Sequence, residues 1–468
     1  MHPLLPVLEV SVEYKPIVRT GRRVLDVVRA FGLGERSEHY TIFKDFKLEW
    51  DDPAVIYVTG ESGGGKTTLL KAFKNLYGDR CVDMDDVAVD DGEVLCESIG
   101  MDTGEALYFL GIAGLGEAML FVRSYGELSA GQKYRYKLAK TFYKAVVEGR
   151  DAIAIDEFCS LLDRLTARAV AYTAQKFARR FGRTLIAASS HTDLIDDLNP
   201  DIIVVKPFLK PPVVERREYE PKPFSLLSEV SITEGGVRDY RELEVFHYKG
   251  FTPAYIAKIF KALYRDGNVG VIVYSYPPLE SKARRRVFGS NLRDYAKSGR
   301  LLRISRVVAH PSWRGVGLGV RLVSETLHLC GADIVETEAA MAVYNPFFEK
   351  AGMKLGSIEE VPYTDNHRLL DDTLRRYGFD PMLRISWQRI YEWLSNLTYE
   401  EYVKLQADLY RIQAPKAYGD LLRRKHMLKS GSVSRRRLAT YIHRYPVPGT
   451  QIAYYYWVNP RVEAAKNA

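Results

Sequence analysis

The fold of the first half of this chain is decided by one stretch of its sequence: Val55-Ile56-Tyr57-Val58-Thr59-Gly60-Glu61-Ser62-Gly63-Gly64-Gly65-Lys66-Thr67-Thr68. The apolar, β-branched residues at its start predict a buried strand, and the residues from Thr67 to Leu70 predict the beginning of a helix. Between them, Gly60 to Thr67 fit the pattern G-x-x-x-x-G-K-[ST] in full, in the strand–loop–helix setting that the motif requires. The stretch therefore predicts an α/β domain with a nucleotide-binding loop.

The composition of this loop suits it to hold the phosphates of a nucleoside triphosphate. Its glycines let successive backbone N–H groups curl around a phosphate, and the helix that follows adds the positive end of its dipole. We expect the Lys66 ammonium to reach the β- and γ-phosphates and the Thr67 hydroxyl to ligate Mg²⁺. The predicted nucleotide-binding residues are Gly60, Glu61, Ser62, Gly63, Gly64, Gly65, Lys66, Thr67 and Thr68.

The composition of the whole chain is that of a folded protein with no membrane segment. Its 468 residues correspond to two to four domains of about 150 residues each. No run of about 18 apolar residues occurs, and the N-terminus lacks a signal pattern, so we expect a cytoplasmic protein. The four cysteines follow neither a metal-ligand nor a disulfide spacing. The formal charge of +8 favours an anionic partner, and nucleic acid, a nucleotide or coenzyme A would each satisfy it.

A second apolar run, Asp151 to Ile155, predicts another buried strand, and this strand ends in two carboxylates. Asp156 is placed to hold the magnesium through water, and Glu157 is placed to polarise the attacking water. With a full phosphate loop upstream, these residues make hydrolysis of ATP or GTP the leading chemistry. Tyr40, which begins another predicted strand, is a candidate to stack on adenine, or else it is an ordinary core or surface tyrosine.

A short motif lies between these two strands: Leu128-Ser129-Ala130-Gly131-Gln132. It resembles the L-S-G-G-Q signature of ABC-type ATPases, with Ala130 in place of one glycine. Two further family marks follow in order. The segment Ser160 to Asp163 resembles the loop after the catalytic glutamate, and Ala187 to His191 resembles the strand that ends in the switch histidine. The resemblance covers about residues 1 to 207.

The resemblance implies a site shared between two subunits. In ABC-type ATPases two nucleotide domains close head to tail, and each nucleotide lies between the phosphate loop of one subunit and the signature of the other. Ser129 and Gly131 would then approach the nucleotide from the opposite chain, while His191 and the catalytic Glu157 would act within their own chain. The resemblance therefore predicts a homodimer when ATP is bound.

One feature of that family is missing from this sequence. The family has a glutamine between the phosphate loop and the signature that touches the metal, but residues 67 to 131 contain no glutamine. Either Asp83, Asp85 or Asp86 serves in its place, or the coupling to a partner is altered.

A proline-rich, charged connector separates the first domain from the second. We predict an ATPase domain at residues 1–207, a linker at 208–224, a second α/β domain at 225–365 and a C-terminal region at 366–468. Within the second domain, the residue patterns predict an amphipathic helix at 253–265 and strands at 225–232, 240–248 and 270–276.

A second glycine-rich turn lies in this domain, within the stretch Leu302 to Gly319. The pattern predicts a strand that ends at His310, then an anion nest, then a helix from Val320. Because no lysine follows its last glycine, the turn is not a second nucleoside-triphosphate loop. It resembles the [RQ]-x-x-G-x-[GA] motif of the GNAT acetyltransferases, which is matched by Arg314, Gly317 and Gly319.

The segment Tyr344 to Met353 resembles a second GNAT segment, F-Y-E-K-x-G-F, so the resemblance covers about residues 225 to 360 with an extra stretch between Pro277 and Gly299. It implies an acetyl-CoA site, with the pyrophosphate on the amides of the glycine-rich turn and the pantetheine along the preceding strand. The residues so implied are Val307, Val308, Arg314, Gly315, Val316, Gly317, Leu318, Gly319, Val320 and Asn345.

The acid and base of such a transferase are less clearly marked. Phe348 stands where many family members carry the tyrosine that protonates the departing thiolate. Tyr344 lies one helical turn earlier and is our candidate catalytic acid. The candidate bases, which are otherwise ordinary loop or strand-end residues, are Glu336, Glu338 and His310. The alternative is a domain that binds CoA without turnover.

The C-terminal region is rich in aromatic and basic residues in helical-looking segments. Ser434 is predicted to cap a helix through Tyr441, which pairs with the segment near residues 421–428 in a helix–turn–helix-like arrangement. Basic residues among aromatics suit RNA or DNA binding. The alternative is a solvated helical face whose aromatics fill a small core. Tyr454 to Trp457 predict a closing strand.

Together these features predict an ABC-type ATPase joined to a GNAT-type acetyltransferase and a basic, mainly helical C-terminal region, a tandem that resembles archaeal and phage fusions of the two families. The predicted function is acetyl transfer to nucleic acid, or to a nucleic-acid-bound substrate, coupled to ATP hydrolysis. One alternative is a nucleic-acid- or ribosome-associated ATPase whose GNAT-like domain only binds CoA or a partner. A second alternative is a transporter-type ATPase subunit.

Overall fold

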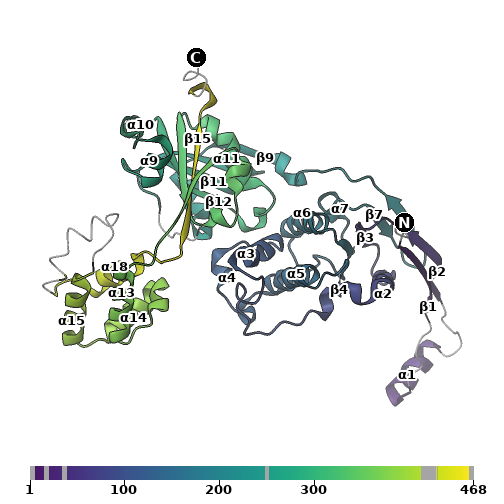
Figure 1. The fold of residues 1–468 in the computed structure, drawn as a ribbon. Helices are drawn as coiled ribbons and strands as arrows, with labels where there is room; N and C mark the ends of the chain where they lie inside the picture. Colours follow the sequence, from purple (N-terminus) through teal and green to yellow (C-terminus); the bar gives the residue numbers. More distant parts are fainter. Residues whose placement is uncertain are drawn as a thin grey trace. The chain divides into compact units, whose positions relative to one another are not determined.

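The computed structural model describes residues 6–14, 20–33, 40–247, 252–412, 428 and 431–462 (Figure 1). The chain divides into two compact units. Unit one comprises the residues up to Thr337, together with Tyr344–Lys354 and the residues from Tyr456 onward, and unit two comprises Glu338–Val343 and Leu355–Tyr455. No helix of the described residues is both long enough and apolar enough to cross a membrane.

The first half of unit one is built on a six-stranded sheet in the order β4-β5-β6-β3-β7-β8. The first five strands in this order are parallel, and β8 pairs antiparallel with β7. The strands are β3 (Val55–Thr59), β4 (Cys81–Asp83), β5 (Ala152–Ile155), β6 (Thr184–Ala188), β7 (Ile202–Val205) and β8 (Val213–Arg216). A separate antiparallel pair consists of β1 (Val7–Tyr14) and β2 (Tyr40–Glu49).

Both faces of this sheet are covered, so every residue of β3 is buried, and all but Thr59 are hydrophobic. Val55 and Tyr57 pack in one core with α3, α5 and α6, whereas Ile56 and Val58 pack in another with α2 and the β1–β2 pair. The helices of this part are α1 (Arg22–Phe31), α2 (Lys66–Tyr77), α3 (Thr103–Ile112), α4 (Ala118–Phe121), α5 (Ala130–Val147), α6 (Arg164–Phe181) and α7 (Ile195–Leu198).

The second sheet has seven strands in the order β14-β15-β13-β12-β11-β10-β9. β9 to β12 pair antiparallel with their neighbours, and β12 pairs parallel with β13. The strands are β9 (Val230–Glu234), β10 (Ile256–Tyr264), β11 (Gly267–Ser275), β12 (Leu301–Ala309), β13 (Ile334–Ala339), β14 (Lys354–Glu360) and β15 (Gln451–Val458). The helices that accompany them are α8 (Val237–Leu243), α9 (Lys282–Phe288), α10 (Arg293–Lys297), α11 (Leu318–Leu329) and α12 (Phe347–Lys350).

Three of the predicted elements in this part are wrong or displaced. The predicted helix at 253–265 is the strand β10, because this segment pairs on both sides, with β9 and with β11. Its adjacent apolar residues mimic a helical face because both faces of the strand are covered: Ile259 and Phe260 are both buried. The predicted strand at 240–248 begins within helix α8 instead. The strand predicted at 225–232 starts only at Val230, after a 3₁₀ turn, η5 (Ser225–Glu229).

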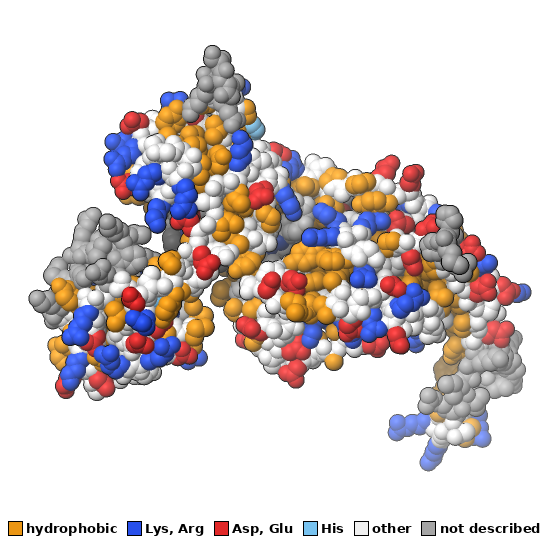
Figure 2. Space-filling view, viewed as in Figure 1, with side chains coloured by type: hydrophobic (Ala, Val, Ile, Leu, Met, Phe, Trp, Pro, Cys, Tyr) orange, Lys and Arg blue, Asp and Glu red, His pale blue; other side chains and the backbone are white. Residues whose placement is uncertain are grey.

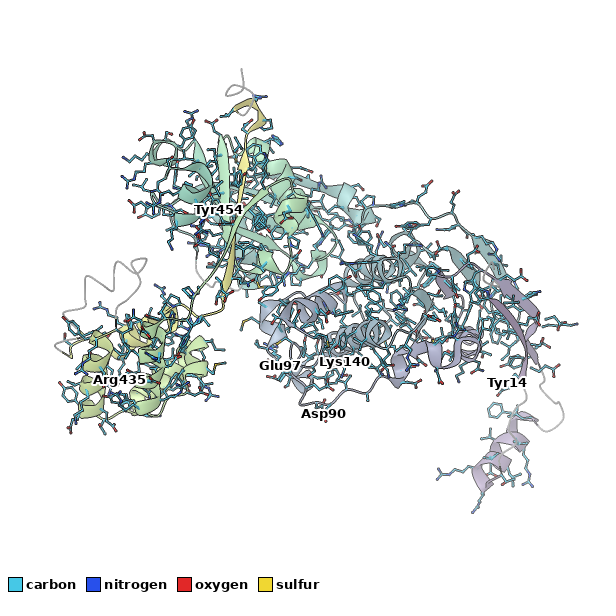
Figure 3. All side chains as sticks on the ribbon, in the orientation of Figure 1. Tyr14, Asp90, Glu97, Lys140, Arg435 and Tyr454 are labelled. Atoms are coloured by element: carbon cyan, nitrogen blue, oxygen red, sulfur yellow. The ribbon has the colours of Figure 1, made fainter. Side chains whose placement is uncertain are left out.

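The closing strand predicted at Tyr454–Trp457 is confirmed as part of β15, in which Tyr454 is buried (Figure 3). Because β15 lies between β13 and β14 in the sheet order, residues beyond 365 belong to the same sheet as residues before it. The domain boundary predicted at residue 365 therefore lies in the segment that connects two strands of one sheet. A set of helices is inserted along the chain between β14 and β15: α13 (Asp365–Arg376), α14 (Trp387–Asn396), α15 (Tyr399–Tyr410) and α18 (Arg435–Arg444).

These inserted helices have a hydrophobic core of their own. Aromatic residues of the C-terminal region contribute to it, including Trp387, Trp393, Tyr402 and Tyr410. The predicted helix after Ser434 is present as α18, although the Ser434 side chain makes no capping hydrogen bond. Of the predicted partner segment at 421–428, only Leu428 is among the described residues.

Candidate functional site

The phosphate-binding loop leaves β3 at Gly60 and ends where α2 begins at Lys66. The Lys66 side chain is buried, and its Nζ donates to the carbonyl oxygens of Gly60 and Glu61, each at 3.0 Å. The backbone N–H of Gly64 donates to the Glu61 carbonyl oxygen at 3.1 Å. The predicted strand–loop–helix is therefore present, with the lysine ammonium held inside the loop that it is expected to serve.

The two glycines that the motif specifies have no room for a side chain. Gly60 has φ +138°, and a Cβ added there would lie 2.1 Å from the Lys206 carbonyl oxygen. Gly65 has φ +105°, and its Cβ would lie 2.5 Å from the Cγ2 atom of Ile42. Both values of φ lie in the region that side chains disfavour. The loop is thus a close-packed backbone cradle, the form expected of an anion nest.

The predicted carboxylates follow β5, two places from β3 in the sheet order with β6 between them. Because β5, β6 and β3 are parallel, Asp156 and the phosphate loop lie at the same edge of the sheet. Asp156 accepts from the backbone N–H of Glu157 at 2.9 Å. Glu157 has φ +46°, an uncommon conformation for this residue type, and its exposed carboxylate accepts from the Ser160 hydroxyl at 2.8 Å.

His191 follows β6 at this same edge. The Tyr57 hydroxyl of β3 donates to the His191 carbonyl oxygen, and burial raises the pKa of that tyrosine. Next to it, Asp193 forms an ion pair with Arg164, the first residue of α6, with Nε to Oδ2 at 2.9 Å. The segment that carries the predicted switch histidine is therefore tied both to β3 and to the helix that follows the carboxylates.

The oxygen atoms at this edge suit a magnesium ion. Thr67 is exposed in the first turn of α2, and Asp156 is half-buried after β5. A hydroxyl and a carboxylate are hard oxygen ligands, which Mg²⁺ prefers together with water and phosphate oxygens. The donor set of the described residues therefore fits the predicted ion.

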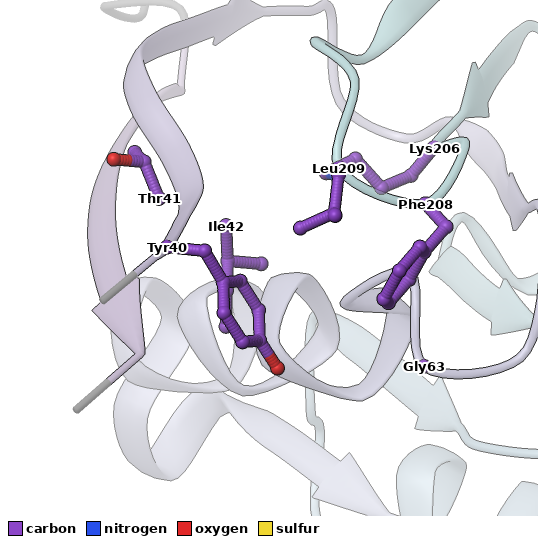
Figure 4. Close-up of a pocket in the computed structure, with 8 residues that line it drawn as sticks. Tyr40, Thr41, Ile42, Gly63, Lys206, Phe208 and Leu209 are labelled. Carbon is purple, nitrogen blue, oxygen red and sulfur yellow. The ribbon is translucent and has the colours of Figure 1, made fainter. Parts of the chain in front are cut away.

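A pocket beside the loop brings Tyr40 close to Gly63 and Gly64 (Figure 4). Its ring lies 6.5 Å from that of Phe208, centroid to centroid. The residues that line the pocket are Tyr40, Thr41, Ile42, Gly63, Gly64, Lys206, Phe208 and Leu209. Phe208 and Leu209 were missed by the sequence analysis, because they lie in the connector and no motif marks them.

The signature residues lie at the start of α5. Ser129 is the N-cap of this helix, in a capping box in which its N–H donates to Gln132 Oε1 at 3.0 Å. Gly131 lies beside Leu161 and Leu162, just after the carboxylates. Of the residues considered in place of the missing glutamine, Asp83 is buried and forms an ion pair with Lys74 of α2, whereas Asp85 and Asp86 are exposed.

The second glycine-rich turn connects β12 to α11. Within the described residues the ladder between β12 and β13 has three pairs and ends at Arg303 and Glu336, whereas β12 continues to Ala309 beside β11. Ser305 is an extra residue in β12 relative to β11, which makes a β-bulge. Val307 and Val308 lie beyond this bulge, and α11 starts at Leu318 after Gly317, whose φ is +101°.

The side chain of Arg314 does not point into an open site. Its guanidinium donates to the carbonyl oxygens of Gly116 at 2.7 Å, Phe246 at 3.0 Å and Ala309 at 3.2 Å. Gly315 faces the ATPase part too, since a Cβ added to it would lie 3.2 Å from Cγ2 of Thr173 on α6. The turn is therefore in contact with the first domain, which the sequence analysis did not foresee.

The candidate acid and bases of the transferase lie in different surroundings. Tyr344 is 44% exposed, but it precedes the short helix α12 and is not one turn before Phe348 on a common helix as predicted. Glu336 is buried in a two-point ion pair with Arg284, with oxygen–nitrogen distances of 2.6 and 2.9 Å, so it is not a free base. His310 directly follows β12, and burial together with the charge of Arg314 lowers its pKa.

Of the comparisons with known proteins, the match to a family model bears on the first domain. The family model described as an AAA domain matches residues 50–188. Comparison with curated protein sequences finds no significant match. Similar solved structures include the dimeric structure of MJ0796, a bacterial ABC transporter cassette, with 17% identity, a TM-score of 0.34 and coverage of 46% of this chain and 100% of that one.

Two further structures are similar at the same level. The post-hydrolysis structure of the MJ0796 cassette bound to ADP and Pi has 16% identity, a TM-score of 0.32 and coverage of 46% and 100%. The cbiO1 protein from Clostridium perfringens, part of the ABC transporter complex cbiONQ, has 16% identity, a TM-score of 0.30 and coverage of 45% and 87%. The loop geometry, the strand order and the family match together show that the chain contains a P-loop ATPase domain over about residues 50–188.

Proposed function

We propose that this protein hydrolyses ATP in sites shared by two subunits and couples closure of that dimer to acetyl transfer from acetyl-CoA. The observation that carries the ATPase half is the meeting of Lys66, Asp156 and Glu157 at one edge of a parallel sheet. A lysine-bearing phosphate cradle, a metal-holding carboxylate and a water-polarising carboxylate are the parts that triphosphate hydrolysis needs.

In this proposal Thr67 and Asp156 hold Mg²⁺, which when bound neutralises charge on the β- and γ-phosphates. Lys66 leaves the carbonyl oxygens of Gly60 and Glu61 to contact the phosphates. Glu157 takes a proton from the attacking water, and His191 contacts the γ-phosphate. The signature at Ser129 and Gly131 completes the site from a second, head-to-tail copy, as the resemblance to ABC-type ATPases implies.

The acetyltransferase half is supported by the second sheet. Within the described residues the β12–β13 ladder ends at Arg303 and Glu336, before Val307 and Val308, along which the GNAT resemblance places the pantetheine. In this proposal the pyrophosphate binds the amides from Gly315 to Val320 at the start of α11, and the pantetheine lies along Val307 and Val308. Asn345 adds a contact to the coenzyme.

In this proposal His310 serves as the base and Tyr344 as the acid of the transfer. The acceptor nitrogen attacks the thioester carbonyl carbon, the carbon–sulfur bond breaks, and the acetyl group leaves the coenzyme. His310, whose lowered pKa keeps it neutral near pH 7, takes the proton from the nitrogen, and Tyr344 gives a proton to the departing thiolate. We propose nucleic acid, or a substrate bound to it, as the acceptor, since the chain is basic.

The acetyl-transfer proposal is tested by incubating the protein with labelled acetyl-CoA and RNA, DNA or protein fractions, with and without ATP. We expect label in the nucleic-acid fraction that depends on ATP. Gly319→Glu should abolish it, because it adds a carboxylate where phosphates bind. Gly319→Ala is the matched control, since a Cβ there meets only Phe347 at an ordinary 3.8 Å. Absence of label from every fraction would contradict acetyl transfer.

A second candidate function is favoured by the contacts of Arg314 and Gly315 with the ATPase part. In that case the GNAT-like domain is a docking platform of a nucleic-acid- or ribosome-associated ATPase. Gly319→Glu distinguishes the two functions: it eliminates function under the first, and it leaves ATPase-dependent function intact under the second.

A further inference from the structure

The segment between β11 and β12, which contains α9 and α10, has a high net positive charge for its length. Residues 280–300 contain seven lysines and arginines and two acidic residues, a net charge of +5, whereas the whole chain has a formal charge of +8. Figure 2 shows lysine and arginine side chains gathered over α9 and α10. Neither the ATP site nor the proposed coenzyme site uses these residues.

This segment is held in place by a buried arginine. Arg284 is fully buried, and besides its ion pair with Glu336 it donates to the carbonyl oxygens of Asn291 at 2.9 Å and Pro278 at 3.0 Å. The apolar residues of the segment, Phe288, Leu292, Tyr295 and Ala296, pack inward in one cluster with β12 and β13. The segment is therefore fixed, and its outer face is left to charged and polar residues.

The outer face presents exposed cations around a hollow. Lys282, Arg285 and Lys297 are exposed, and within the described part of the chain none of the three takes part in an ion pair. The hollow has a volume of about 540 Å³ and is lined by Arg285, Ser290, Asn291, Leu292, Arg293, Asp294 and Tyr295. Arg293 at its edge forms an ion pair with Glu280.

We propose that this face binds the phosphate backbone of a single-stranded nucleic acid and that the hollow receives one of its nucleotides. Fixed, unpaired cations suit phosphates, and a hollow with hydroxyl, amide and guanidinium groups suits an unstacked nucleotide. A membrane surface fits less well, because the apolar side chains point inward. This inference rests on the proposal of a nucleic-acid partner, and it names the surface that contacts the partner.

The inserted C-terminal helices are less basic over the residues that the structure describes. Residues 365–412 and 431–450 contain eleven lysines and arginines and eight acidic residues, a net charge of +3. One of these cations, Arg435 of α18, donates to the carbonyl oxygens of Leu394 and Leu397. The aromatic side chains of these helices largely fill the core between them. The net positive charge is therefore larger on the segment between β11 and β12.

The test compares two full-length variants that lose the same charge. The first combines Lys282→Gln, Arg285→Gln and Lys297→Gln. The control combines Lys44→Gln, Lys222→Gln and Arg238→Gln, which remove three exposed cations elsewhere in unit one. Binding of a labelled single-stranded RNA and of a double-stranded RNA is measured by fluorescence anisotropy from 50 to 200 mM salt, with about 20 nucleotides per strand.

We expect the first variant to lose about tenfold or more in affinity for single-stranded RNA, with a salt-dependence slope smaller by about 2, and the control to bind like the wild type. Ser290→Trp, which fills the hollow without changing charge, should weaken single-stranded binding more than double-stranded binding. Equal losses in the two triple variants would overturn the inference, as would unchanged binding by the first. Absence of RNA binding by the wild type even at 50 mM salt would contradict both this inference and the nucleic-acid partner proposed above.

Discussion

Gly60 and Gly65 show how much of the nucleotide site depends on single residues. Each has a positive φ, and each lies against neighbours that leave no space for a methyl group. The motif alone identifies both positions, because its pattern specifies glycine at each end of the loop. It does not identify what they pack against, Lys206 and Ile42, since these come from distant parts of the chain. The residue types of the site were thus predictable, and their close neighbours were not.

The packing around Gly60 predicts a specific loss of stability. Gly60→Ala should lower the free energy of unfolding by about 2 to 4 kcal/mol, because it adds backbone strain and a contact with the Lys206 carbonyl oxygen. Gly182→Ala is the control: Gly182 also has a positive φ, +61°, but a Cβ there meets nothing within 4 Å, so only about 1 to 2 kcal/mol is expected. Urea denaturation of the two variants measures the difference. Equal losses would show that the close approach at Gly60 is unimportant.

The proposed role of Glu157 predicts that its substitution slows ATP hydrolysis but leaves ATP binding unchanged. Glu157→Gln keeps the shape of the side chain and removes its ability to take a proton from water, so the ATPase rate should fall by about 10² to 10⁴. ATP affinity should change little, because Lys66 and the loop amides remain. Glu97→Gln, at an exposed position away from the site, should have no effect on either. A steady-state assay and equilibrium binding of ATP check both quantities. An undiminished rate in Glu157→Gln would exclude this residue as the base.

At the scale of the elements, local sequence patterns predict single helices and strands well, but they do not predict which strands pair across the sheet. The strand before Gly60, the strand before Asp156 and the helix after Gly317 are all marked by an apolar run beside a turn, and the structure contains all three. β10 was predicted as a helix because its apolar residues fall at helical spacing. Its partners β9 and β11 decide otherwise, and they are not visible in a short window of sequence.

The anchoring of α9 by Arg284 leads to a prediction about this element. Arg284→Leu leaves the Glu336 carboxylate buried without its ion pair, and it should lower the free energy of unfolding by about 3 to 5 kcal/mol. The double variant Arg284→Leu with Glu336→Leu should recover a large part of that loss. Arg285→Leu, at the exposed neighbouring position, should change the free energy of unfolding by about 0.5 kcal/mol or less. A loss in the double variant as large as in the single one would contradict the pairing.

At the scale of the whole molecule, the order of parts along the chain is not their order in the fold. The sequence predicts a second domain that ends near residue 365, yet β15 returns to the same sheet after the inserted helices. A change to aromatic-rich, helical-looking segments marks the start of the insertion, but a single short strand rich in tyrosine is all that signals its end. The sequence likewise predicts a nucleic-acid partner through the basic C-terminal region, whereas over the described residues a net charge of +5 lies on residues 280–300, between β11 and β12.

The central claim is that each ATP site is built from two chains, and mixing two inactive variants tests it most directly. Lys66→Ala removes the phosphate-binding lysine, and Ser129→Arg blocks the signature. A dimer with one chain of each kind keeps one complete site, so an equal mixture that pairs at random should recover about a quarter of the wild-type ATPase rate. Each variant alone should have almost none. A mixture no more active than its components, or full activity of Ser129→Arg alone, would contradict the shared site.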